Sequence, residues 1–517
     1  MKSSDSFHSL RSKGLSWFLA KIVIVLGIAL LGLLLFLCLT TRSVVVQDGS
    51  ERSQLLRQPL RFYLLLPISL AMLYFCRFFL QKISSTTLLK ICTAAYLIAG
   101  LYLIFNVSPN NRADSQAVFE SALQFQGGDF SSVAHGYMAH YPHQLGLATY
   151  DRLLFLFSPN PLFTFFVNLL GVICINYHLY LLSDLVFEGN DLVNKYTILL
   201  SYLFLPQLFF ILFAYGTIPG FVCLVICIYH AACCLKGKKQ KHILSLCLCL
   251  LFASLSILIR NNYMIGILAL ICVFGLSFLD KPNWKKAAFI VLLALTLVVP
   301  QKLLYAFYEA ESGLEVSRGR PKSLWVAMGL QESPRCSGWF NGYSSEVFVQ
   351  MNGDYDASDA VAKAEIRSRL NTFAQDPHYA ATFFSNKIRS TWCDATFQSI
   401  WSGPSLYEQE QSVYTKPLAL IYYGDTLYNL IFDFCDLLLV DLLLFALIYM
   451  IRCHKDENIF ALFPIIFLIG SFLFHLFWET KSQYVYMFIF MLIPLSAKAI
   501  SGAPVFGFPF KHTKTAE

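Results

Sequence analysis

Apolar runs of about 20 residues recur along almost the whole chain and limit its fold more than any other feature. The first is "LSWFLAKIVIVLGIALLGLLLFLCLT" at residues 15–40, and similar runs follow as far as Ile500. About 20 apolar residues in a helix cross the hydrocarbon core of a bilayer. The composition agrees, because 56% of the 517 residues are hydrophobic and 14% are charged, more apolar than a soluble core requires. The sequence predicts an all-α polytopic membrane protein.

The first apolar run is expected to remain in the protein, because it is longer than a signal-peptide core and no small-x-small cleavage pattern precedes "QDGSERSQ". Short basic linkers give the orientation, since Lys and Arg near spans stay in the cytoplasm. Examples are "KGKKQK" at 236–241 and "KPNWKK" at 281–286. With these inside, both termini are cytoplasmic and twelve spans are predicted, at 15–41, 60–81, 87–106, 161–187, 193–212, 215–235, 243–259, 262–280, 286–307, 426–451, 458–477 and 483–500.

Residues 142–158 are apolar but are predicted to form an interfacial helix, with Pro142 in its first turn. Asp151 and Arg152 lie in the middle of this segment, where burial in lipid costs several kcal/mol. An additional span here would also move "KGKKQK" to the outside. Five parts are then expected: N-terminal transmembrane helices at 1–106, a first extracytoplasmic loop at 107–160, a central transmembrane module at 161–307, a small extracytoplasmic cap without its own core at 308–425, and C-terminal helices with a cytoplasmic tail at 426–517.

The 15 cysteines lie mostly within apolar runs, where they pack as small hydrophobic residues, and no zinc or redox spacing is present. Cys336 and Cys393 both fall in the predicted cap, and their pairing stays open. Trp325, Trp339, Trp392 and Trp401 also fall there, either as interfacial anchors or as stacking faces for sugar rings.

The predicted topology brings polar groups from three distant turns to one membrane face. Asp114 follows the third span, Arg260 and Asn261 lie in the turn "LIRNNYM", and Glu479 and Lys481 lie in "HLFWETKSQYVY". Each group alone is also compatible with a water-facing anchor at a helix end. Glu479, Gln483 and Tyr486 recur at helical spacing, so one face of the predicted twelfth helix would carry polar groups toward the same site.

Asp114 has two readings. It could cap the predicted helix "DSQAVFESALQF" through the free amides of the first turn. It could instead be a general base that removes a proton from an acceptor hydroxyl. Glu120 is a poor partner, since six residues along a helix place it roughly 120° away. The spacing of His135, His140 and His143 predicts no metal site, although a bound divalent ion remains open, and no other cofactor is expected.

A reaction in which Asp114 removes a proton from an acceptor hydroxyl also needs cations to stabilise the leaving group. If a lipid phosphate leaves, the charge that develops must be met by Arg or Lys at the membrane surface. Arg260 and Lys481 are suitable. A lipid substrate would also account for a catalyst embedded in a membrane.

The stretch "FQGGDFSSVAHGYMAHYPHQLG", the "IRNN" turn and the late "KSQYVY", together with the overall architecture, resemble the bacterial polyprenyl-phosphate-sugar-dependent glycosyltransferases of the GT-C class. The segment from 321, "PKSLWVAMGLQESPRCSGWFNGY", resembles members that modify cell-wall polymers. One departure is that the acidic loop follows the third predicted span, whereas in the class it usually follows the first. An extra amino-terminal hairpin at 15–81 would account for this.

The resemblance implies an inverting transfer with Asp114 as the base. Arg260, Lys481 and Tyr484 would bind the donor phosphate, and Glu479, Asn261, His143 and Gln144 would bind substrate. The partners would be a polyprenyl-phosphate-linked sugar, a glycan or glycolipid acceptor and the lipid bilayer, with no nucleic acid. The enzyme would be a multi-pass cell-membrane protein whose active site faces the extracytoplasmic side.

Two alternatives stay open. A transporter or flippase of lipid-linked sugars would also need many helices, and Asp433, Asp436 and Asp441 within a predicted span favour it, because acids inside spans are normally functional or paired. A membrane polymerase or ligase would share the fold and differ in substrate. The sugar, the acceptor and the linkage are set by pocket shape, which no motif here reports.

Overall fold

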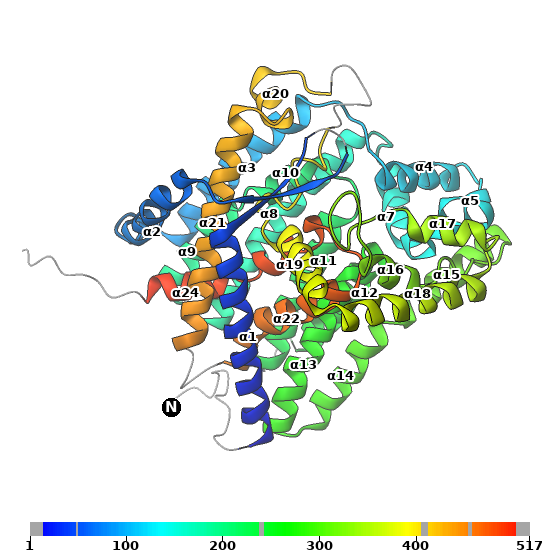
Figure 1. The fold of residues 1–517 in the computed structure, drawn as a ribbon. Helices are drawn as coiled ribbons and strands as arrows, with labels where there is room; N and C mark the ends of the chain where they lie inside the picture. The colour runs from blue at the N-terminus through cyan, green and yellow to red at the C-terminus, as the bar shows by residue number, and fades with distance from the viewer. Residues whose placement is uncertain (1–13, 48–49, 237–241, 405–411, 453–457, 503–517) are drawn as a thin grey trace, which may run out of the picture.

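A computed structural model describes residues 14–47, 50–236, 242–404, 412–452 and 458–502. Within these ranges, nine helices are long and apolar enough to cross a membrane: Leu15–Thr40, Leu60–Leu80, Ser85–Phe105, Pro161–Val186, Thr217–Lys236, Asn261–Asp280, Trp284–Ser312, Thr426–Arg452 and Ile459–Phe477. The chain is therefore a mostly helical, polytopic membrane protein (Figure 1). Many large apolar side chains on the first three of these helices are exposed, as lipid contact requires.

The predicted count of twelve spans stays a prediction. A tenth span results if Asp191–Leu203 and Pro206–Leu212, which meet at 49°, cross together, and Ile243–Ile259 and Tyr486–Ser501 are shorter apolar helices. The predicted helix at 193–212 is broken at Pro206, which begins the short helix α10 (Pro206–Phe209), because a proline inside a helix removes a backbone donor and clashes with the preceding turn. The predicted helix at 286–307 lies within the single candidate span Trp284–Ser312, in which regular helix stops at Thr296 and resumes at Val299.

Figure 1 labels most of the helices that form the bundle. They are α1 (Leu15–Thr40), α2 (Leu60–Leu80), α3 (Ser85–Phe105), α8 (Pro161–Val186), α9 (Asp191–Leu203), α10 (Pro206–Phe209), α11 (Thr217–Lys236), α12 (His242–Ile259), α13 (Met264–Asp280), α14 (Trp284–Thr296), α15 (Val299–Ser312), α21 (Thr426–Arg452), α22 (Phe463–Phe477), α23 (Tyr486–Phe490) and α24 (Ile493–Ser501), with 3-10 turns η2 (Phe210–Leu212), η4 (Asn261–Tyr263), η5 (Ile459–Leu462) and η6 (Ser482–Tyr484).

An antiparallel hairpin between α1 and α2 departs from the all-α prediction. Strand β1 (Thr41–Val45) pairs with β2 (Ser53–Arg57), with Thr41 opposite Arg57. Each strand also reaches the cap: the Ser43 amide donates to the Cys393 carbonyl at 2.9 Å, and the Ser53 amide donates to the Arg335 carbonyl at 3.0 Å. The hairpin thus joins the first two helices to the cap.

The hairpin also explains two of the three acids in α21. Arg42 of β1 lies 2.9 Å from Asp433 and 3.5 Å from Asp436, and Arg61 of α2 lies 2.7 Å from Asp433. Acids in apolar helices are retained when they are paired. Asp433 and Asp436 therefore fix α21 to the hairpin, whereas Asp441 lies one to two turns deeper and is also buried.

The cap contains α16 (Ser323–Gly329), α17 (Tyr343–Gln350), α18 (Tyr355–Gln375) and α19 (Pro377–Trp392), and the short helix α20 (Lys416–Tyr422) leads into α21. The cap contains two small apolar clusters rather than one independent core. One is formed by Leu324, Ala327, Val347, Phe348 and Ala362, and the other by Leu330, Phe373 and Phe383. Trp339 and Trp392 are fully buried, so their rings are not available to sugars.

Cys336 and Cys393 have different neighbours. The sulfur of Cys393 lies 3.7 Å from that of Cys38 at the end of α1, whereas Cys336 donates to the Asn386 carbonyl at 4.0 Å. All three thiols are free. The pairing that the sequence left open is therefore not present in the structure.

The polar stretch after α3 folds into α4 (Asp114–Gln126), α5 (Ser131–His135), α6 (Tyr137–His140), the 3-10 turn η1 (Pro142–Gln144) and α7 (Leu145–Phe155). Pro142 begins η1, so it precedes α7 and is not in its first turn as predicted. Helix α7 has 11 residues, which is too short to cross a bilayer. Asp151 is buried within it, which is consistent with packing against protein rather than lipid.

Close packing at Gly146 fixes α7 against α12. A Cβ atom at Gly146 would lie 2.0 Å from the Leu258 carbonyl oxygen, and backbone cannot yield as a flexible side chain can. The contact lies two residues before Arg260. It therefore sets the distance between the "YPHQLG" segment and the turn that carries Arg260.

We expect Gly146→Ala to destabilise the protein by roughly 1–3 kcal/mol, because the added methyl group must separate α7 from α12. The measurement is the thermal unfolding midpoint in detergent. Gly275→Ala in α13 is the matched control, since a Cβ atom at Gly275 meets nothing within 4 Å. Equal midpoints for the two variants would contradict the packing argument.

Candidate active site

Asp114 is the first residue of α4 and is exposed to solvent. The N-cap position belongs to Ala113, and no side-chain capping hydrogen bond is recorded at this helix start. Ala113 has a φ of +50°, which L-residues other than Asn, Asp and Gly rarely adopt. Such backbone strain persists where surrounding structure enforces it, and it is common at functional sites. Asp114 is thus not the N-cap residue but the acidic residue of the first turn of α4.

The "YPHQLG" segment is held by contacts from both sides. The Tyr141 hydroxyl accepts a hydrogen bond from Arg320, and the guanidinium of Arg320 lies 4.7 Å from the Tyr141 ring centroid. Three residues further on, the Gln144 side-chain amide donates to the Tyr215 hydroxyl at 2.7 Å. Gly146 then packs on α12. Each contact fixes one turn of this segment, which explains why a polar stretch keeps a defined shape.

Tyr215, in the loop before α11, joins three parts of the site. Its hydroxyl lies 3.4 Å from the Tyr137 hydroxyl, in addition to its bond with Gln144. Arg260 donates to the Tyr215 carbonyl at 2.8 Å and to the Thr217 hydroxyl at 2.7 Å. The Arg260 guanidinium lies 5.4 Å from the Tyr215 ring and 5.8 Å from the Tyr484 ring. Three residues that the sequence assigns to one site therefore lie around Tyr215: Gln144, Arg260 and Tyr484.

The segment from Trp478 to Lys481 is extended rather than helical. The Glu479 amide donates to the Trp325 carbonyl at 3.1 Å, and the Thr480 amide donates to the Gly338 carbonyl at 3.0 Å. Because these amides are used by the cap, the following helix α23 starts at Tyr486. The expectation that Glu479 shares a helix face with Gln483 and Tyr486 is therefore wrong.

Gly329 and Lys387 hold this extended segment against the cap. A Cβ atom at Gly329 would lie 2.4 Å from the Phe477 carbonyl oxygen, so glycine permits the close approach. The Lys387 ammonium donates to the Gly329 carbonyl, and to the Trp478 carbonyl at 2.9 Å. Lys387 is 1% exposed, and this burial lowers its pKa from 10.5 to about 7.

Lys481 is fixed by a carboxylate from the opposite end of the sequence. Its ammonium lies 2.6 Å from Glu51, and the second oxygen of Glu51 pairs with Arg335 of the cap. The Glu51 side chain is 5% exposed, and Glu51 has a φ of +54° in the hairpin turn. The hairpin therefore delivers a buried carboxylate to the site.

Electrostatic effects place Asp114 in the same neighbourhood. Burial is the main cause that raises the pKa of Tyr215, and the negative charge of Asp114 is the next. Burial also raises the pKa of Tyr484 and Glu479, and the charge of Asp114 adds to both shifts. Burial lowers the pKa of Lys481, and the charge of Asp114 opposes that shift. Three segments that were expected to converge thus do so around an exposed carboxylate.

Glu479 has unused bonding capacity. It is 5% exposed, and its Oε1 atom has no hydrogen-bond partner among the described residues. Buried polar atoms without partners are rare in folded proteins, and those that occur need an explanation such as a ligand or water.

His143 and Asn261 lie beside the other predicted residues. His143 contacts the Tyr141 ring edge to face, with centroids 6.1 Å apart, and burial lowers the pKa of its imidazole to about 4. A neutral imidazole suits hydrogen bonding to a hydroxyl better than binding a phosphate. Asn261 is half-buried and begins η4 directly after Arg260.

Four site residues are absent from the sequence-based set: Glu51, Tyr215, Arg335 and Lys387. Glu51 lies in "QDGSERSQ", which the sequence presents as a polar linker. Arg335 lies in the segment from 321 whose resemblance gave no role to single residues, and Lys387 lies outside any motif noted in the cap. Tyr215 offered one signal, since it begins the predicted span 215–235 at the same membrane face as Arg260.

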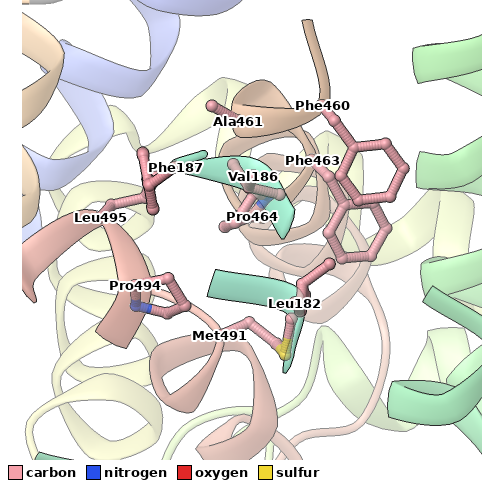
Figure 2. Close-up of a pocket in the computed structure, with 10 residues that line it drawn as sticks. All are labelled: Leu182, Val186, Phe187, Phe460, Ala461, Phe463, Pro464, Met491, Pro494 and Leu495. Carbon is pink, nitrogen blue, oxygen red and sulfur yellow. The ribbon is translucent and has the colours of Figure 1, made fainter. Parts of the chain in front are cut away.

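The described residues offer no metal-binding group, and the apolar pocket lies away from the candidate site. No group of three or more His, Cys, Asp or Glu residues arranged to hold a metal ion occurs in the described ranges. An apolar pocket lies at the other end of the bundle, where the end of α8 meets the starts of α22 and α24 (Figure 2). All of its ten lining residues are apolar, so it offers no group for acid–base chemistry.

Comparison of the chain with known protein families, with curated proteins and with solved structures finds no match.

We expect Glu51→Gln to lower the free energy of unfolding by about 2 kcal/mol, because Lys481 and Arg335 lose their shared counter-charge in a partly buried site. The measurement is the thermal unfolding midpoint in detergent, with Glu315→Gln at an exposed position as the control. The double variant with Lys481→Met should be less destabilised than the sum of the two single changes. Additive effects would show that Glu51 and Lys481 do not interact.

Lys387 gives a pH-dependent prediction. Because its pKa falls from 10.5 to about 7 on folding, the unfolded chain binds more protons between these values, and stability should rise with pH across that window. The unfolding midpoint of the wild type should rise from pH 7 to pH 9 by roughly a few degrees more than that of Lys387→Met. Lys416→Met, at an exposed lysine, should keep the wild-type slope. Identical slopes in all three proteins would refute the assignment.

Proposed function

We propose that the chain is an integral membrane glycosyltransferase of the GT-C type, with its active site facing the extracytoplasmic side. It would move a sugar from a polyprenyl-phosphate donor to a cell-envelope glycopolymer or a lipid-linked acceptor. The observation that carries the proposal is the exposed carboxylate of Asp114, held near two cations, Arg260 and Lys481, that lie at the ends of apolar helices.

In the proposed reaction the Asp114 carboxylate accepts the proton of an acceptor hydroxyl. The hydroxyl oxygen attacks the anomeric carbon as the bond from that carbon to the phosphate oxygen breaks. The electron pair of that bond leaves with the polyprenyl phosphate, and the configuration at the carbon inverts. The phosphate is a good leaving group without protonation, so a second carboxylic acid is not required as it is in glycosidases.

The two cations have suitable chemistry for that leaving group. Arg260 is held rigidly by the Tyr215 carbonyl and the Thr217 hydroxyl, so little ordering is needed when a phosphate arrives. The ammonium of Lys481 has three donors, and its bond to Glu51 uses one of them. The Tyr484 ring lies 5.8 Å from the Arg260 guanidinium, and its phenol would donate to the same phosphate. Cations fixed before the reaction stabilise developing charge more effectively than mobile ones.

The remaining predicted residues suit the sugar. The unpartnered Glu479 Oε1 can accept a hydrogen bond from a sugar hydroxyl. Gln144, His143 and Asn261 surround the same region and offer neutral polar groups. We assign these four residues to substrate binding.

The alternative is a transporter or flippase of lipid-linked sugars. The observation that favours it is Asp441, which is buried in the apolar helix α21 and whose Oδ1 has no hydrogen-bond partner among the described residues. Asp433 and Asp436 give it no support, since both pair with Arg42. The glycosyltransferase accounts for the grouped charges at one end of the bundle, and the flippase accounts for one residue.

We expect Asp114→Asn to lower sugar transfer by about 10²–10⁴-fold, the usual effect of removing a general base. Purified protein in detergent would be incubated with a panel of radiolabelled polyprenyl-phosphate sugars, and label in an acceptor or in water would be counted. Asp129→Asn is the matched control, because Asp129 is exposed in the same stretch and its Oδ1 accepts from the Ser131 amide, which an Asn oxygen can replace.

Full transfer by a folded Asp114→Asn protein would remove Asp114 from the base role. If the wild type consumed no donor but moved it between leaflets in proteoliposomes, the flippase would be supported. A requirement for Asp441 in that movement would strengthen it.

A further inference from the structure

A polar cleft of about 310 Å³ lies between α4 and the α5–α6 segment. This volume is at the lower end of the roughly 300–1,000 Å³ typical of small-molecule sites. The lining residues are Ala117, Glu120, Ser121, Gln124, Ser131, Ser132, His135, Gly136 and Tyr137. Figure 1 shows α4 and α5 together at one side of the molecule. None of these residues was assigned above to binding the donor phosphate or the sugar.

The cleft and Asp114 lie along one face of α4. Asp114, Ala117, Ser121 and Gln124 follow at spacings of three, four and three, which places them within about 80° of one another around the helix. Gln124 lies ten positions after Asp114, or about 15 Å along the axis. A molecule that lies in the cleft along α4 therefore points one end toward the Asp114 carboxylate.

A second path joins the cleft to the site. Tyr137 lines the cleft, and its hydroxyl lies 3.4 Å from the hydroxyl of Tyr215. The Tyr215 hydroxyl also accepts a hydrogen bond from Gln144, and the Tyr215 carbonyl accepts one from Arg260. Tyr215 therefore contacts one residue of the cleft, Tyr137, and one of the two cations, Arg260. An acceptor in the cleft and a donor phosphate on Arg260 would both approach Tyr215.

The lining residues specify the chemistry of the ligand. Three serine hydroxyls, an amide, an imidazole and a phenol can all donate to and accept from sugar hydroxyls, and Glu120 accepts. Neither Lys nor Arg is among the lining residues, and the Glu120 carboxylate repels anions. Ser121 and Ser132 are already fixed, with their hydroxyl oxygens 3.1 Å apart, so the base of the cleft is ordered before a ligand binds.

We propose that this cleft binds the acceptor, and that the acceptor is an uncharged, hydroxyl-rich saccharide rather than a phosphate- or carboxylate-bearing glycan. The acceptor role rests on the proposed glycosyltransferase function, whereas the binding of an uncharged saccharide does not. The cleft narrows the open choice of acceptor to neutral glycans, whether free or lipid-linked.

Binding is measured first, without any donor, on the full chain in detergent. Saturation-transfer NMR would follow uncharged tetrasaccharides built from glucose, mannose or N-acetylglucosamine, beside tetragalacturonate as the anionic counterpart. Two variants on α4 provide the test. Gln124→Trp fills the cleft, and Gln126→Trp places the same side chain on the opposite face of the exposed last turn.

We expect at least one uncharged tetrasaccharide to bind, with a dissociation constant that Gln124→Trp raises at least tenfold and Gln126→Trp leaves unchanged. Tetragalacturonate should bind at least tenfold more weakly than the neutral ligand. The proposal is overturned if no uncharged tetrasaccharide binds the wild type, if both variants bind equally, or if the anionic ligand binds as tightly.

Donor turnover separates this proposal from the proposed function. If Gln124→Trp still transfers label from the donor to water but loses transfer to the saccharide, both proposals are supported. If Gln124→Trp keeps transfer to the saccharide, the cleft is not the acceptor site and the enzyme assignment stands. If the wild type consumes no donor yet binds a neutral saccharide through the cleft, the glycosyltransferase fails and saccharide binding remains.

Discussion

The candidate site depends on the two ion pairs that the buried Glu51 carboxylate forms. The carboxylate pairs with Arg335 of the cap and with Lys481 of the late loop, and it comes from the hairpin that follows the first helix. Removing a carboxylate from between two cations leaves both charges partly buried and uncompensated, which is far more costly than the loss of a surface ion pair. One residue thereby fixes three segments that are hundreds of positions apart in the chain.

Backbone contacts complete what Glu51 begins. The Trp478 carbonyl is held by Lys387, and the Glu479 and Thr480 amides are held by carbonyls of the cap, so the segment cannot continue as helix. The backbone of residues 479–480 is hydrogen-bonded to the cap. The cap, and not α22, therefore fixes the positions of the Glu479 and Lys481 side chains. The cap therefore acts as the support of the site and not as an independent cover. Its two small apolar clusters are consistent with this, since neither is large enough to act as a domain core.

Hydropathy was sufficient to find the long helices, because burial in lipid requires a continuous apolar run whatever the partner helix. Topology then placed Asp114, Arg260 and Lys481 at one membrane face, and the structure brings their neighbourhoods together through Tyr215 and Tyr484. The hairpin was missed because five-residue strands carry little periodic signal. Glu51 was missed for a different reason: its importance comes from Arg335 and Lys481, and no local pattern in "QDGSERSQ" reports contacts with residues so distant.

The charged residues are unevenly distributed between the two parts of the candidate site. Arg260, Lys481 and Arg335 lie on the loops of the bundle and the cap, whereas the cleft along α4 is lined by neutral groups and one carboxylate. A phosphate is attracted to the first region and repelled from the second, and an uncharged saccharide has no such preference. Asp114 lies on the same helix as the cleft, and we propose that it takes a proton from a hydroxyl on the neutral side while the phosphate leaves toward the cationic side. In the proposed reaction, this asymmetry would keep the phosphate out of the acceptor cleft, so the specificity for which molecule donates and which accepts would follow from electrostatics before any sugar-specific contact is made.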